Sequence, residues 1–146
     1  AGLIPVFIGG TDDYARISKI EELSKLRGFN AAGKLELDES TALISGTLIH
    51  FGVDSFGTHV AEATGVKSLT IFGPTNPRLI AVLRAQNITV MKKTSCSPKE
   101  GKIYCCPDAG RSCRSVSCMR ELEANDVLSV LIDFWEDRLK ERVIVF

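Results

Sequence analysis

Two neighbouring segments, residues 52–63 and 71–77, most constrain what this chain can fold into. Each ends an apolar run of strand length in a polar turn that contains glycine, and the first turn leads directly into an alanine-rich helix. The first amides of a helix have no partner within it and lie at the positive end of its dipole. The pattern therefore predicts an anion site at the start of this helix, suited to a diphosphate.

The polar side chains of the first turn have a ligand-binding and a structural interpretation. The hydroxyls of Ser55 and Thr58 can cap the helix or donate to a ligand, and His59 lies in the first helical turn. Alternatively, His59 is a hydrogen-bonded capping side chain and Asp54 caps the turn through its own backbone.

Composition excludes several classes of protein. The 146 residues are 45% apolar and 25% charged, with 18 basic and 18 acidic side chains, which indicates a single soluble globular domain and no nucleic-acid partner. There is no secretory signal and no apolar run near the roughly 20 residues of a membrane helix, so we expect a cytoplasmic protein. Because the chain opens on a core strand without an initiator methionine, we also expect missing sequence upstream.

Apolar runs of strand length alternate with helical patterns, which predicts an α/β fold with a mostly parallel sheet. The expected strands are residues 4–8, 29–32, 48–53, 68–72 and 88–91. The expected helices start at Asp12 or Asp13, at Asp38, at Thr58 and at residue 125, and the last of them runs to residue 140. That final helix is expected to bury one face, made of Val127, Leu128, Leu131, Ile132, Trp135 and Leu139.

Polar turns follow four of these strands, at residues 9–13, 33–34, 54–55 and 73–75, and three of these ranges contain glycine. Ligands of open parallel sheets bind outside the carboxyl ends of the strands, so the four turns together predict a nucleotide crevice. A carboxylate of Asp12 or Asp13 could accept hydrogen bonds from ribose hydroxyls there. Both residues are also good helix starters in any protein, and that structural interpretation is slightly favoured.

The same residues resemble a known family. Asp54-Ser55, His59, Ala61, Ala63 and Gly65, with the turn at residues 72–77, are similar to the carboxyl-terminal domain of family 9 glycosyltransferases, the ADP-heptose:lipopolysaccharide heptosyltransferases. The likeness covers most of the chain. It implies a Rossmann-like parallel sheet with flanking helices, the carboxyl-terminal half of a GT-B fold. Residues 1–146 would then be a single nucleotide-sugar-binding domain whose amino-terminal acceptor domain is absent.

The resemblance also implies a site and a reaction. The residues around the diphosphate would be Asp54, Ser55, Gly57, Thr58 and His59. Asp13, in preference to Asp12, would reach the ribose. The backbone near Leu35 and Leu37 would frame the adenine. The reaction would be inverting glycosyl transfer from a nucleotide sugar to a lipid-linked saccharide, at the inner face of the inner membrane. The base would lie on the absent domain, so this fragment would hold no catalytic residue, metal or cofactor and would be inactive alone. Phe56 departs from the family pattern, in which many members have glycine there.

A cysteine-rich segment, residues 94–119, is a separate feature. It contains Cys96, Cys105, Cys106, Cys113 and Cys118. The spacing lacks the paired C-x-x-C of strong zinc motifs, so zinc and disulfides both remain open, and a loop-stabilising role is favoured over a catalytic thiol. The segment is locally basic, which suits either a solvated loop or contact with an anionic acceptor or a membrane surface.

Two alternative functions remain open from the sequence. One is another GT-B-type sugar-nucleotide enzyme, such as a UDP-sugar epimerase. The other is a noncatalytic module whose function is carried by the cysteine segment and a bound metal.

Overall fold

The computed structural model describes residues 3–25, 28–82, 84, 86–105, 113–139 and 143–146. Contacts within the chain divide it into two compact units, Ala1–Leu43 and Ile44–Phe146, which are described separately below. The single nucleotide-sugar-binding domain expected over residues 1–146 stays a prediction.

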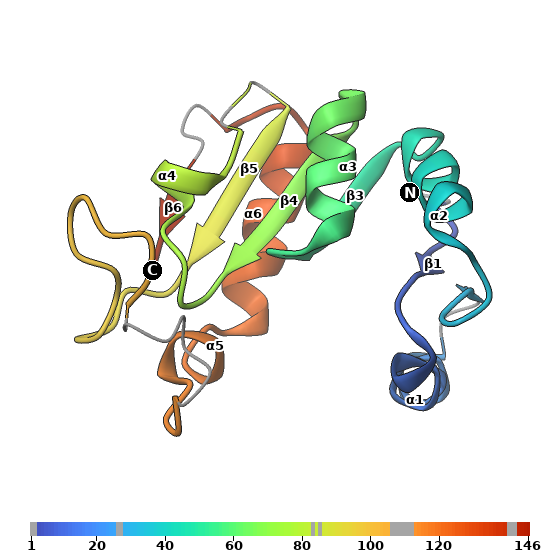
Figure 1. Cartoon of the computed structure of the whole chain (residues 1–146), viewed down its shortest axis with the longest axis horizontal. Helices are drawn as coiled ribbons and strands as arrows, with labels where there is room; N and C mark the ends of the chain where they lie inside the picture. Colours follow the sequence, from blue (N-terminus) through green and yellow to red (C-terminus); the bar gives the residue numbers. More distant parts are fainter. Residues whose placement is uncertain (1–2, 26–27, 83, 85, 106–112, 140–142) are drawn as a thin grey trace. The chain divides into compact units, whose positions relative to one another are not determined.

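The first unit contains a two-stranded parallel sheet. Strands β1 (Val6–Phe7) and β2 (Phe29–Asn30) pair in parallel, with Val6 opposite Phe29. Between them lie the short helix η1 (Thr11–Asp13) and helix α1 (Tyr14–Ser24), so the order is strand, helix, strand (Figure 1). Both strands fall inside the predicted ranges but are only two residues long. Helix α2 (Leu37–Ser45) then leads into the second unit and starts one residue before Asp38, which therefore lies in its first turn.

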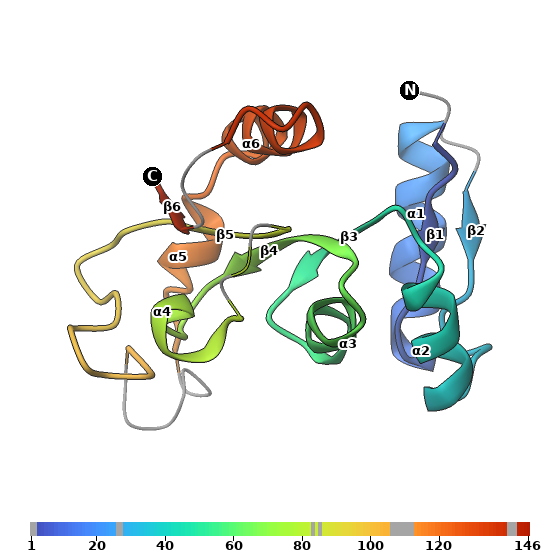
Figure 2. The same ribbon diagram turned by 90° about the horizontal axis from the view of Figure 1, so that it is seen from above.

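The second unit contains a four-stranded parallel sheet in the order β3-β4-β5-β6. Its strands are β3 (Ile49–Val53), β4 (Lys67–Phe72), β5 (Asn87–Met91) and β6 (Val143–Val145). Helix α3 (Phe56–Thr64) covers one face and helix α6 (Ala124–Trp135) the other, as Figures 1 and 2 show from two directions. The short helices α4 (Pro77–Ile80) and α5 (Ser117–Arg120) complete the described elements. The predicted α/β fold with parallel pairing and flanking helices is confirmed.

The core of the second unit lies between the sheet and α6. Its buried residues are Leu69, Ile88, Val90, Val127, Val130 and Phe134. Full burial of each such side chain contributes roughly 1.5–3 kcal/mol. This core is therefore the main source of stability for the sheet whose carboxyl-terminal edge carries the site described below.

The predicted buried face of the final helix is confirmed in part. Val127 is in the core and Leu131 and Leu139 pack against it, whereas Leu128, Ile132 and Trp135 are exposed, and the buried positions that were missed are Val130 and Phe134. The helix also ends at Trp135 instead of residue 140, since Asp137 adopts a left-handed backbone conformation with φ 55°. Residue 140 itself lies outside the described residues.

Candidate functional site

The candidate site is the turn between β3 and α3, at the carboxyl end of the four-stranded sheet. A second turn, which follows β4, is bonded to it. The Thr75 hydroxyl donates to Asp54 Oδ2 at 2.7 Å, and the Asp54 amide donates to the Ile71 carbonyl at 3.2 Å. The two segments singled out in the sequence are thus joined through Asp54.

The start of α3 retains free hydrogen-bond donors. The helix begins at Phe56, two residues before the predicted start, and Ser55 is its N-cap in extended conformation with no side-chain capping bond. The amides of Thr58 and His59 both donate to the Ser55 carbonyl, at 3.1 and 3.4 Å. Within the part of the chain that the structure describes, the amides of Phe56 and Gly57 make no hydrogen bond. The positive end of the helix thus has two adjacent unbonded donors, one on the exposed Phe56 and one on the buried Gly57.

The Thr58 side chain has a structural position. It is only 1% exposed, and its hydroxyl donates to the Val53 carbonyl at 2.9 Å and lies 3.2 Å from the Thr70 hydroxyl. The hydroxyl of Thr58 therefore does not cap the helix, and its contact with a ligand stays a prediction. It bonds the helix to the sheet instead.

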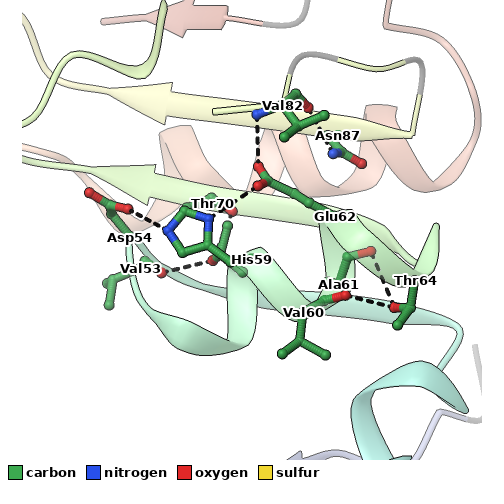
Figure 3. Close-up of polar contacts among 11 residues, drawn as sticks. Val53, Asp54, His59, Val60, Ala61, Glu62, Thr64, Thr70, Val82 and Asn87 are labelled. Carbon is green, nitrogen blue, oxygen red and sulfur yellow. Dashed lines mark hydrogen bonds and ion pairs between the residues drawn. The ribbon is translucent and has the colours of Figure 1, made fainter. Parts of the chain in front are cut away.

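His59 lies between two carboxylates (Figure 3). Its Nε2 is 3.7 Å from Asp54 Oδ1 and its Nδ1 is 3.3 Å from Glu62 Oε2. About half of the His59 side chain is exposed, whereas only 4% of the Glu62 side chain is. The other Glu62 oxygen, Oε1, accepts the Val82 amide at 3.2 Å.

Glu62 was not among the residues selected from the sequence. The signal that could have found it is its spacing, because residues three apart on a helix are neighbours and Glu62 follows His59 by three. Its second partner, the Val82 amide, is 20 residues away and no local pattern indicates it.

Gly57 allows α3 to approach β3 closely. A Cβ atom at this position would lie 2.8 Å from Cε1 of His50, a half-buried residue of β3. Burial lowers the pKa of His50, which favours its neutral ring. The His50 Nε2 is buried and has no hydrogen-bond partner among the described residues. Gly57 thus has a packing function, in addition to the diphosphate contact that the resemblance implies.

The remaining predicted site residues belong to the first unit. Asp13 Oδ2 accepts the Gly10 amide at 3.1 Å, and Oδ1 lies 3.5 Å from Arg16 Nη1. The carboxylate therefore stabilises its own turn. Leu35 is half-buried and Leu37 is exposed, and Leu37 contributes to a shallow open depression lined also by Glu36, Asp38, Thr41 and Ala42. The structure thus groups Asp54, Ser55, Gly57, Thr58 and His59 in the second unit, and Asp13, Leu35 and Leu37 in the first.

The cysteine-rich segment lies against the second turn of the site. The Cys105 amide donates to the Pro74 carbonyl at 2.9 Å, and Cys118 packs beside Gly73. Cys96 and Cys118 are free thiols, and burial, together with the neighbouring cysteines, raises the pKa of the Cys118 thiol. Among the residues whose placement is described, no group of three or more metal-ligating side chains occurs. Cys106 lies outside the described residues. Zinc and disulfides stay predictions.

The fold and site together define a Rossmann-like α/β protein with a helix start at the carboxyl edge of a parallel sheet. The model of glycosyltransferase family 9 (heptosyltransferase) matches residues 2–106. The chain belongs to this family, as the sequence motifs predicted. No curated protein and no solved structure matches the chain. None of the helices in the described ranges is long and apolar enough to cross a membrane.

Proposed function

We propose that this chain is the donor-binding domain of an inverting glycosyltransferase that uses an ADP-heptose-like nucleotide sugar in lipopolysaccharide core biosynthesis. Membership of glycosyltransferase family 9 supports the reaction class. The observation that carries the site assignment is the pair of unbonded amides of Phe56 and Gly57, with the half-exposed His59 beside them. These donors suit the oxygens of a diphosphate.

In the proposed reaction, an acceptor hydroxyl attacks the anomeric carbon of the sugar. The bond from that carbon to the diphosphate oxygen breaks, and configuration inverts. A carboxylate base on the amino-terminal domain takes the hydroxyl proton, so this fragment alone has no turnover. The helix-start amides and His59 stabilise the negative charge that develops on the leaving diphosphate.

Asp54 has a different task in this proposal, because a carboxylate repels a phosphate. Its bonds to Thr75 and Ile71 hold the two turns together, and its second oxygen faces His59. Asp13 and the backbone near Leu35 and Leu37 are assigned to the ribose and the adenine on the family resemblance.

Calorimetric titration of the protein with ADP tests the proposal. We expect binding by the wild type and at least about tenfold weaker binding by the double variant Asp54→Ala, His59→Ala. The matched control, Lys99→Ala with Glu100→Ala, removes one exposed charge of each sign and should bind like the wild type. Absence of binding heat in both wild type and double variant counts against the proposal.

The same titration separates the alternatives. Tighter binding of UDP than of ADP would favour another sugar-nucleotide enzyme, such as an epimerase. A stoichiometric metal in the purified protein, with no nucleotide affinity, would favour a module whose function is carried by the cysteine segment.

A further inference from the structure

Glu62 is a buried carboxylate in the last turn of α3. A carboxyl group rarely occupies such a position unless donors surround it, because burial removes its hydration. Here both oxygens have a partner: Oε1 accepts the Val82 amide at 3.2 Å and Oε2 lies 3.3 Å from His59 Nδ1 (Figure 3). The Val82 amide can only donate a hydrogen bond, so Oε1 of Glu62 must be the acceptor.

The direction of the second bond follows from the same chemistry. An ionised carboxylate has no hydrogen to donate, so the hydrogen between Glu62 and His59 must belong to Nδ1. In the neutral ring, Nε2 then carries the lone pair. That atom is on the side of Asp54, 3.7 Å from Oδ1, beside the start of α3.

We infer that Glu62 is a positioning residue for His59: it holds the Nδ1–H and thereby presents Nε2 at the turn between β3 and α3. This inference deepens the proposed function and rests on it, because that turn is the assigned diphosphate site. Once protonated, Nε2 donates to a phosphate oxygen while Nδ1 stays bonded to Glu62.

Glu62 is better placed than Asp54 to orient the ring. Its contact with His59 is shorter, 3.3 Å against 3.7 Å, and its side chain is 4% exposed whereas that of Asp54 is 22% exposed. Moreover, Glu62 and His59 are on the same helix, and the Val82 bond prevents the carboxylate from rotating away.

The variant Glu62→Gln tests this assignment without removing the anchor. Its amide oxygen can still accept the Val82 amide, which leaves the NH2 group facing His59 Nδ1. That group donates, so the ring hydrogen should move from Nδ1 to Nε2. Nitrogen-15 NMR of the imidazole, recorded without nucleotide, shows which nitrogen carries the hydrogen. The exposed variant Glu121→Gln is the matched control.

We expect the Nδ1–H form in the wild type and in Glu121→Gln, and the Nε2–H form in Glu62→Gln. Protection of the Val82 amide from exchange should be unchanged. ADP binding should weaken by about tenfold, because Nδ1 then accepts from the amide and the ring stays neutral, so Nε2 offers the phosphate a neutral hydrogen bond in place of a charge-assisted one. An Nε2–H ring in the wild type overturns the inference, and the wild-type spectrum decides this even if the variant folds poorly. A ring that keeps its hydrogen on Nδ1 in Glu62→Gln overturns the inference as well. Wild type that fails to bind ADP counts against the proposed function instead.

Discussion

The turn after β1 and the turn after β3 have similar sequences, since each combines glycine with an aspartate and opens a helix, yet they use their amides differently. After β1, the Asp13 carboxylate folds back and accepts the Gly10 amide, so the turn satisfies one of its own donors. After β3, the Asp54 carboxylate is bonded to Thr75, and the amides of Phe56 and Gly57 remain without partners in the described chain. The two turns thus differ in the partner of the carboxylate: Asp13 accepts an amide of its own turn, whereas Asp54 accepts the Thr75 hydroxyl.

Replacement of the glycines tests how tightly each turn is packed, and should give the largest effect. Gly57→Val would place atoms within 2.8 Å of the half-buried His50 ring, so we expect a loss of about 1–3 kcal/mol in the free energy of unfolding. At Gly10, the counterpart in the turn after β1, an added Cβ meets nothing within 4 Å, so Gly10→Val should change stability by less than about 0.5 kcal/mol. Urea unfolding of both variants measures the difference. Equal losses would remove this contrast between the turns.

The free amides themselves can be tested one at a time. Phe56→Pro removes the amide hydrogen of Phe56, and proline is tolerated at the first helical position. Ser55, which precedes it, already has the extended backbone that proline requires, with φ −157° and ψ 177°. We expect ADP binding to weaken by about tenfold, the cost of one charge-assisted hydrogen bond, with little change in stability.

Calorimetry and thermal unfolding of the same Phe56→Pro preparation check both parts. Phe56→Ala, which keeps the amide, is the control for loss of the exposed ring. Unchanged affinity in Phe56→Pro would show that the amide of this turn is not used, and the two turns would then be equivalent.

Sequence patterns predicted the strands of the second unit well and the details of the site poorly. β3, β4 and β5 lie within one residue of their predicted bounds, because each is rich in β-branched and other apolar residues and is bounded by polar turns. β6 was missed, since three residues are too few to form a pattern. The buried face of α6 was predicted in part, because Val127 and Leu131 are in or against the core while the apolar Leu128 and Ile132 are exposed.

Within the candidate site, local motifs selected residues but did not indicate their partners. Asp54 and His59 were selected from local motifs, whereas Thr75 reaches Asp54 across 21 residues and Val82 reaches Glu62 across 20. Threonine is a residue type that caps helices, but α3 starts at Phe56, so the Thr58 hydroxyl lies within the helix and donates to the Val53 carbonyl. Contacts of this kind depend on how the two turns pack, which no single segment of sequence encodes.

The smallest expected effect concerns His50, which packs against Gly57 of the turn after β3. The turn after β1 has no comparable imidazole among the described residues. Burial lowers the pKa of His50 below its ordinary value of 6.5, so the unfolded chain binds a proton at higher pH than the folded chain does. The contribution of His50 to stability is therefore fully present above pH 6.5, and falls as the pH drops through that value towards the lower folded pKa. Urea unfolding between pH 5 and pH 8 should show this decline in the wild type, and a weaker one in His50→Gln, whose side chain does not titrate. Identical pH profiles would mean that protonation of His50 does not oppose the packing of α3 on β3.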